Sequence, residues 1–179
     1  MKGVCMRTVL SVIGTRPEAI TMAPVVQQLA RHPDQFRSVV CSTGQHRQML
    51  DQVLQLFDIT PEYDLNLMQH DQRLAQLTAR LILCLDETLD VVKPDYVLAQ
   101  GDTTTVLAAS LTAFYRGIPF GHVEAGLRTG DKRCPFPEEI NRRLADAVTD
   151  LYFAPTQRAR QALLREGFAD TNIFVTGRW

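Results

Sequence analysis

The sequence lacks a cluster of basic residues and lacks any long apolar run. Its 179 residues carry 19 Lys and Arg against 20 Asp and Glu, which gives a formal net charge of −1. Because nucleic-acid-binding proteins concentrate basic residues on one face, this balance argues against nucleic acid as a partner. The longest apolar stretches are strand-sized, well short of the ~20 residues of a membrane helix, so we expect no membrane association.

Metal-binding and secretory patterns are missing as well. The cysteines are at positions 5, 41, 84 and 134, and the histidines at 32, 46, 70 and 122. They form no C-x-x-C pair and no H-E-x-x-H motif, so we expect no metal site. The start of the chain lacks the basic flank, apolar run and small-residue cleavage site of a signal peptide, and we expect a cytoplasmic protein.

What the chain does have is an alternation of short apolar runs with longer segments of helical period. The runs with the size and β-branched or aromatic content of buried strands are 8–13, 36–41, 96–99, 119–123, 151–154 and 173–175. Strands that alternate with helices predict an α/β fold with a parallel sheet and right-handed crossovers.

The helical segments are marked by apolar residues that recur every three or four positions. The clearest is 71–92, which ends before Pro94. A second stripe covers 49–57, and a third is formed by Leu107, Leu111 and Phe114. We expect Pro24 to kink or restart the first helix.

Two carboxylates follow neighbouring strands at the point where each strand ends. Asp102 comes after the run 96–99, and Glu124 ends the run 119–123. Ligands of open α/β sheets bind beyond the carboxyl ends of the strands, so this pair predicts an active-site wall. The structural alternatives are that Asp102 caps the following helix and that Glu124 pairs with Arg128.

Two further acids, Glu138 and Glu139, follow prolines that indicate the start of a helix. Adjacent helical residues do not share a face, so at most one of them points at the site. The segment 141–143 that follows has a simple alternative as solvated surface. Three acids around one cleft spread their pKa values, which lets one act as a base while another holds a proton.

The first strand-to-helix turn is a candidate anion site. Gly14 permits a tight turn, Pro17 suits the first helical position, and Arg16 adds a positive fork beside the free N–H groups of that turn. A substrate with a diphosphate leaving group needs such anion stabilisation opposite the acids. An ordinary capped turn is the alternative, because the segment is not a G-x-G-x-x-G fingerprint.

These segments together resemble a known family. They are GTRPEAI at 14–20, GQHRQMLDQVL at 44–54, GDTTT at 101–105, GHVEAGLRTGD at 121–131 and PFPEEINRRLAD at 135–146. In this order they resemble the amino-terminal half of non-hydrolysing UDP-N-acetylglucosamine 2-epimerases. The resemblance implies interconversion of UDP-N-acetylglucosamine and UDP-N-acetylmannosamine, by loss of UDP with the C2 proton and re-addition of UDP. It implies neither a nicotinamide cofactor nor a metal.

The resemblance also implies roles for residues. Asp102, Glu124 and Glu138 match the essential acids of the family, the first two also as substrate-binding groups, and Arg16 matches a residue that contacts UDP. Allosteric binding of a second, activating substrate molecule is implied for three positions. These are Gln45, His46 and Gln48.

The family fold is a Rossmann-like three-layer domain with a mostly parallel sheet, the first half of a two-domain glycosyltransferase-B-like architecture. Residues 1–179 then form the amino-terminal domain, and the carboxy-terminal UDP-binding domain, which brings a catalytic histidine, is absent from this chain. We expect an exposed apolar patch where that domain would sit, and a homodimer built through the amino-terminal domain.

Two positions depart from the family pattern. Thr21 replaces a lysine near the nucleotide, and Asp71 replaces an arginine of allosterically activated members. The alternatives to an epimerase are a truncated, non-catalytic sugar-nucleotide-binding module and half of a related glycosyltransferase.

Overall fold

The computed structural model describes residues 6–44, 47–67 and 72–177, without the side chains of 47–49. The strands are β1 (Arg7–Ile13), β2 (Phe36–Ser42), β3 (Tyr63–Asp64), β4 (Tyr96–Gln100), β5 (Phe120–Val123), β6 (Leu151–Ala154) and β7 (Ile173–Val175). The helices are α1 (Arg16–Ala30), α2 (Arg47–Leu56), α3 (Leu74–Val92), α4 (Thr104–Tyr115), α5 (Glu138–Ala147) and α6 (Gln157–Arg165), with a 3-10 turn at Asp170–Asn172. Every strand predicted from an apolar run is confirmed, whereas β3 and α6 were not predicted.

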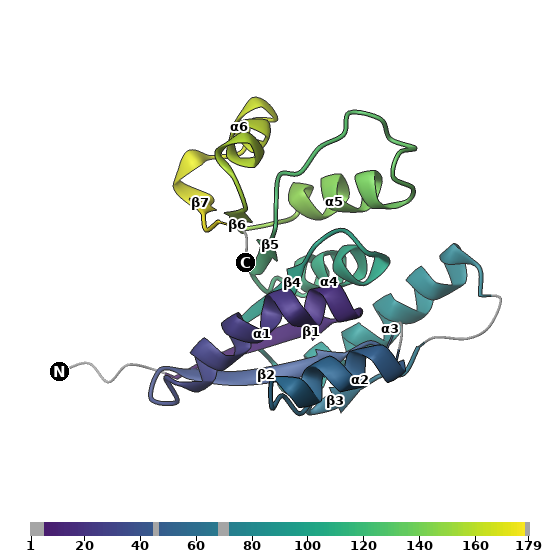
Figure 1. Ribbon diagram of the computed structural model, residues 1–179, viewed down its shortest axis with the longest axis vertical. Coiled ribbons are helices and arrows are strands. Elements are labelled where there is room, and N and C mark those ends of the chain that lie inside the picture. Colours follow the sequence, from purple (N-terminus) through teal and green to yellow (C-terminus); the bar gives the residue numbers. More distant parts are fainter. Residues whose placement is uncertain (1–5, 45–46, 68–71, 178–179) are drawn as a thin grey trace.

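The strands form one sheet in the order β3-β2-β1-β4-β5-β6-β7 (Figure 1). Each described pair of neighbouring strands is parallel, as predicted. β1 and β4 are neighbours although they are far apart in the sequence, so the chain changes direction across the sheet between them. This order is that of Rossmann-like folds, and ligands bind in the crevice at such a switch point.

Two layers of helices cover the sheet. Leu10 and Val12 of β1 belong to the apolar cluster that contains Leu81 and Leu85 of α3, whereas Ile13 joins the cluster of α1 and α2. Because side chains alternate along a strand, one sheet supplies both clusters and the fold has three layers. In Figure 1, α5 and α6 occupy the upper part of the view, above α1, α2 and α3. None of the described helices is long and apolar enough to cross a membrane.

Helix α1 corrects the expectation that Pro24 restarts the first helix. The helix runs without interruption from Arg16 to Ala30, with Pro24 exposed inside it. A proline removes one backbone hydrogen bond, but the buried face of α1, which includes Met22 and Val26, holds the helix against the sheet.

Helix α4 buries the face opposite to the predicted one. Leu107 and Leu111 are only half-buried, and Phe114 is 58% exposed. The buried residues are small ones, such as Ala108, Ala109 and Ala113. α4 packs against both α3 and α5, and small side chains allow such close approach. The larger apolar side chains therefore face outward.

Candidate active site

Asp102 stands at the switch point, and its carboxylate is paired with an arginine. Arg142 Nη2 of α5 lies 3.1 Å from Asp102 Oδ2, and the Asn141 side chain donates to the Asp102 carbonyl at 3.0 Å. Burial raises the pKa of Asp102, as does the neighbouring Glu138 carboxylate, whereas Arg142 and His122 oppose the shift. The cap of α4 is Thr103, whose side chain accepts from the Val106 N–H, so the prediction that Asp102 caps the helix is wrong.

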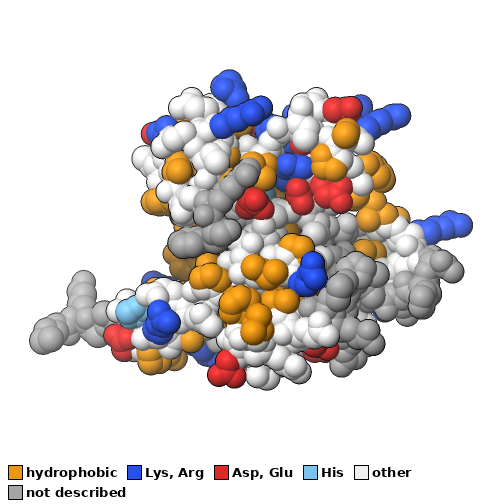
Figure 2. Space-filling view, viewed as in Figure 1, with side chains coloured by type: hydrophobic (Ala, Val, Ile, Leu, Met, Phe, Trp, Pro, Cys, Tyr) orange, Lys and Arg blue, Asp and Glu red, His pale blue; other side chains and the backbone are white. Residues whose placement is uncertain are grey.

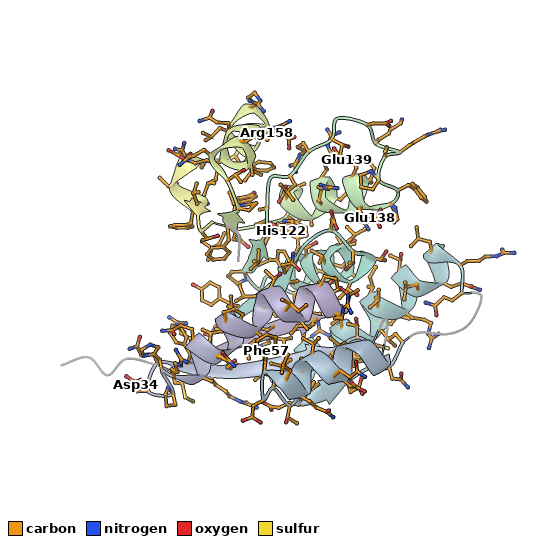
Figure 3. The ribbon with its side chains drawn as sticks, in the orientation of Figure 1. Asp34, Phe57, His122, Glu138, Glu139 and Arg158 are labelled. Carbon is orange, nitrogen blue, oxygen red and sulfur yellow. The ribbon has the colours of Figure 1, made fainter. Side chains whose placement is uncertain are left out.

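The two acids at the start of α5 have different surroundings. Glu139 is fully buried and accepts hydrogen bonds from the Thr129 and Gly130 N–H groups at 3.0 and 3.3 Å. Glu138 is half-buried and close enough to Asp102 to influence its charge. In Figure 3, Glu138 lies on the side of α5 that faces α4, and Glu139 lies toward the loop that precedes the helix. Only one of the pair therefore faces the site.

Glu124 follows β5 in a conformation that few residues other than glycine adopt. Its φ is +70°, and the backbone on both sides is fixed, because the Glu124 and Ala125 N–H groups both donate to the Phe153 carbonyl, at 2.9 and 3.2 Å. Non-glycine residues with positive φ are uncommon and are found disproportionately at functional sites. The Gln100 side chain at the end of β4 donates to the Glu124 carboxylate.

The loops that carry Asp102 and Glu124 are joined directly. The Gly101 N–H donates to the Val123 carbonyl at 3.0 Å, and each of these residues precedes one of the acids. A cavity of about 250 Å³ opens beside Glu124, and its lining includes Thr21, Phe153 and Thr176. Thr21, the position at which the family pattern has a lysine, therefore belongs to this wall.

The β1–α1 turn is built differently from the prediction. The Gly14 and Thr15 N–H groups are not free, because both donate to the buried Glu18 carboxylate, at 2.5 and 3.1 Å. Burial raises the pKa of Glu18 to about 7. Arg16 is exposed at the start of α1. Arg16 is therefore available to bind an anion, whereas these two N–H groups are already hydrogen-bonded to Glu18.

Gly14 is required by a close approach. A Cβ atom at this position would lie 2.5 Å from Thr105 Oγ1 of α4 and 2.9 Å from Thr43 Oγ1. These two hydroxyls are themselves hydrogen-bonded, 3.0 Å apart. The turn after β1 therefore touches the first turn of α4, and the two loops at the switch point form one unit.

Beneath these loops lies a chain of buried charges. His122 of β5 contacts Asp146 of α5, and the other Asp146 oxygen receives Arg128 at 2.8 Å. Arg128 also holds Glu166 through two hydrogen bonds of 2.8 Å. The expectation that Arg128 pairs with Glu124 is therefore wrong, because Arg128 is committed to Asp146 and Glu166.

The segment 141–143 is the clearest site feature that sequence reasoning missed. The prediction of a solvated surface is wrong for Asn141 and Arg142, which are 4% and 7% exposed. Only Arg143 is exposed. A signal was present, since Glu139 and Arg142 are at the helical spacing i,i+3, and Arg142 Nε lies 3.5 Å from Glu139 Oε2.

The predicted allosteric residues lie outside what the structure describes. Gln45 and His46 are not among the described residues, the side chain of Gln48 is not described, and Asp71 falls in the gap between 67 and 72.

Comparison with known proteins agrees with the motifs and the geometry. The family model described as UDP-N-acetylglucosamine 2-epimerase matches residues 27–179. The UDP-N-acetylglucosamine 2-epimerase of Escherichia coli K12 is 58% identical over 169 residues, which are 94% of this chain and 45% of that protein.

Solved structures agree with this result. The crystal structure of the Neisseria meningitidis UDP-GlcNAc 2-epimerase bound to UDP-GlcNAc superimposes with a TM-score of 0.93 at 51% identity, over 96% of this chain and 46% of that one. A lipopolysaccharide outer core galactosyltransferase, 12% identical, matches 95% of this chain and 45% of its own with a TM-score of 0.63, and shares the fold alone. The chain thus spans about half the length of the relatives it matches. The family match over residues 27–179 and the identity with these relatives show that the chain belongs to the UDP-N-acetylglucosamine 2-epimerase family.

Proposed function

We propose that this chain is the amino-terminal half of an enzyme that interconverts UDP-N-acetylglucosamine and UDP-N-acetylmannosamine. The observation that carries the proposal is the set of acids at the switch point. Asp102 is paired with the Arg142 cation, Glu138 is close enough to influence the charge of Asp102, and Glu124 stands on the adjoining loop. Family membership and a relative crystallised with UDP-GlcNAc support a UDP-sugar as the substrate.

The reaction needs groups that take a proton from C2 and return one on the opposite face. As the C2–H bond breaks, its electrons form the C1–C2 double bond and UDP departs with the electrons of the C1–O bond, leaving 2-acetamidoglucal. In the return step a carboxylic acid protonates C2 and UDP attacks C1. Carboxyl groups suit both tasks, because burial and crowding set their pKa values apart. Arg16, at the start of α1, serves as a cation for the UDP diphosphate.

The second half of the substrate site comes from a carboxy-terminal domain. The relatives are about twice as long as this chain, and the crevice has an apolar border that a second domain would cover. Ile20, Phe174 and Val175 are 48%, 46% and 41% exposed. Figure 2 shows apolar side chains gathered over the outer side of α1. Residues 1–179 are, in this proposal, the amino-terminal domain alone.

The outward face of α3 and α4 supports a homodimer. Leu83 and Val91 of α3 and Phe114 and Tyr115 of α4 are between 58% and 68% exposed. Large apolar side chains on adjoining helices are typical of a protein interface. This face belongs to helices other than α1, so a dimer and a second domain do not compete for one surface. The substrate, a soluble sugar nucleotide, is consistent with a cytoplasmic location.

The test is exchange of the C2 proton. The purified chain is incubated with UDP-N-acetylglucosamine in deuterium oxide, alone or fused to the carboxy-terminal half of the Escherichia coli relative. We expect deuterium at C2 and the mannosamine epimer with the fusion. Absence of both from a folded fusion that binds UDP would contradict the proposal and favour a non-catalytic binding module. Transfer of the sugar to an added acceptor, without epimer, would instead indicate a glycosyltransferase.

A further inference from the structure

His122 is buried between two hydrogen-bond acceptors. Its side chain is 0% exposed, and its Nε2 atom lies 2.7 Å from the Gly101 carbonyl oxygen. Its Nδ1 atom lies 2.6 Å from Asp146 Oδ1. A carbonyl oxygen only accepts hydrogen bonds, so Nε2 must carry a proton. The protonation of Nδ1 depends on the state of Asp146.

Asp146 is held in its ionised form. Its second oxygen accepts from Arg128 Nη2 at 2.8 Å and from the Gly126 N–H at 3.3 Å. Burial alone would raise the pKa of Asp146, but His122 and Arg128 outweigh burial and keep it below the ordinary value. An ionised carboxylate accepts and does not donate, so the proton between Asp146 and His122 resides on Nδ1. Both ring nitrogens then carry protons, and the ring is a cation.

The Gly101 carbonyl that this cation holds belongs to the turn that presents Asp102. Gly101 has φ of +88° at the end of β4, and its N–H is bound to the Val123 carbonyl. With the Gly101 carbonyl bound to His122, both backbone polar groups of Gly101 are therefore held. We propose that His122 is a doubly protonated positioning residue, which fixes the Gly101–Asp102 turn through the Gly101 carbonyl and keeps a positive charge beside the Asp102 carboxylate. This proposal rests on the proposed function only for the catalytic role of Asp102.

Charged groups face His122 from several of the elements that pack around it. Asp146 faces it from α5, Asp102 from the β4–α4 turn, and Arg128 from the loop after β5. Burial lowers the pKa of His122 and so does Arg128, but Asp146 and the Gly101 carbonyl raise it above the ordinary value. Beyond Arg128, Glu166 binds the guanidinium at the surface. The charges alternate in sign from Glu166 to His122, which is what stabilises a buried cation.

A merely structural histidine would hold Asp146 and α5 without affecting Asp102. Two substitutions separate these roles, because the side-chain amide of Asn reaches roughly the place of Nδ1 and that of Gln roughly the place of Nε2. His122→Asn keeps a donor for Asp146 and loses the Gly101 bond. His122→Gln keeps a donor for Gly101 and loses the Asp146 bond. Both remove the positive charge.

The first measurement needs no variant and no activity. In the ¹⁵N-labelled chain at about pH 7.5, above the ordinary histidine pKa of about 6.5, we expect NMR to show protons on both ring nitrogens of His122. His32→Gln, a change at an exposed histidine, must leave these signals in place. One unprotonated ring nitrogen would overturn the proposal. This result is independent of whether the protein is an epimerase.

The second measurement uses the fusion with the relative's carboxy-terminal half. We expect His122→Asn to lower kcat about 10²-fold, the size of a misplaced catalytic group, with KM little changed. His122→Gln should retain more activity, and in both variants the carboxyl pKa of Asp102, followed by ¹³C NMR in the chain, should rise. Equal activity in all three proteins, with Asp102 titrating as before, would overturn the proposal. An inactive parent fusion would count against the proposed function, while the ring protonation would stand.

Discussion

The two turns that meet at the switch point are held by buried titratable side chains of opposite type, a carboxyl group and an imidazole. In the β1–α1 turn, Glu18 accepts hydrogen bonds from the Gly14 and Thr15 N–H groups. In the β4–α4 turn, His122 donates to the Gly101 carbonyl. The donors of one turn are thus bound by a carboxyl group, and the acceptor of the other turn is bound by an imidazolium.

The difference lies in what surrounds each charge. His122 has Asp146 as a counter-ion, and Asp146 has Arg128, so the charged form of each is favoured. For Glu18 burial dominates over its hydrogen bonds with the Gly14 and Thr15 backbone and with the Thr103 side chain, and its pKa rises to about 7. Hydrogen bonds from neutral groups therefore do not keep the pKa of this buried carboxyl at its ordinary value, whereas a chain of alternating charges favours the charged forms.

The largest effect is expected from a charge that faces the crevice. Glu124→Gln in the fusion protein should leave the fold intact and lower epimerisation by about 10²- to 10⁴-fold, the usual contribution of a positioned acid or base. Steady-state kinetics and circular dichroism measure the two effects. The control is Glu62→Gln, an exposed acid paired with Arg37, which should be active. Retained activity in the Glu124 variant would remove this residue from the mechanism.

Among effects on stability, the largest is expected from breaking the series of alternating charges from Glu166 through Arg128 and Asp146 to His122. Asp146→Asn leaves the His122 and Arg128 cations without their shared counter-ion, and removal of one partner from a buried ion pair costs roughly 3–5 kcal/mol. Urea unfolding of the 179-residue chain measures this loss. Asp170→Asn, which breaks the exposed pair with Arg160, should cost less than about 1 kcal/mol. Similar losses in the two variants would show that the buried chain adds nothing.

The stability that Glu18 of the β1–α1 turn contributes should depend on pH. The pKa of Glu18 is raised from 4.5 to about 7 in the folded protein, so between these values the native state keeps a proton that the unfolded chain releases. The contribution of Glu18 to stability therefore falls as pH rises from about 4.5 to 7, by up to about 3 kcal/mol. Glu18→Gln keeps an acceptor for Gly14 and Thr15 but does not titrate.

The measurement is the free energy of unfolding of both proteins across that pH range. Near pH 4.5 the two should be similar, and above pH 7 the Gln variant should be the more stable. A constant difference between them at every pH would show that Glu18 titrates normally.

The contact between the two loops gives a smaller effect. Gly14→Ala brings a methyl group within 2.5 Å of Thr105 Oγ1, and overpacking of this kind costs roughly 1–3 kcal/mol. Thr105→Ala in the same chain should relieve part of the cost, so a double-mutant cycle by urea unfolding should give a coupling between the positions. Strict additivity would mean that the loops adjust independently.

Much of the fold could be predicted because its signals are local. Each apolar run of the sequence became a strand, and the helix predicted over 71–92 became α3, which begins at Leu74, since burial on one face imposes the spacing. β3 has two residues, too few for a pattern, and α6 buries only Ala159, Ala162 and Leu163 among polar neighbours. The predicted apolar face of α4 was wrong because the small residues of this helix, rather than its large ones, face the core.

The site was predictable at the strand ends and not beneath them. Asp102 and Glu124 follow strands, so topology alone places them at the crevice. His122 and Asp146 are 24 residues apart, and Arg128 and Glu166 are 38 apart. Such pairs have no local sequence pattern that could predict them. For Arg142 the helical spacing from Glu139 is a local signal, but its pairing with Asp102 is not, because Asp102 lies on another element.

The parallel sheet separates the two ends of its strands. Among the described residues, the turns from strand to helix lie at the edge of the sheet that carries the crevice, so the connections from helix to strand lie at the opposite edge. Gly117 and Gly167 stand in two of these connections, and nothing lies within 4 Å of where their side chains would begin, although their φ of +64° and +92° makes a substitution there strained. A short affinity tag inserted next to either glycine, which itself is kept, would anchor the protein to a surface with its crevice turned toward the solution, the orientation that binding assays with immobilised protein need.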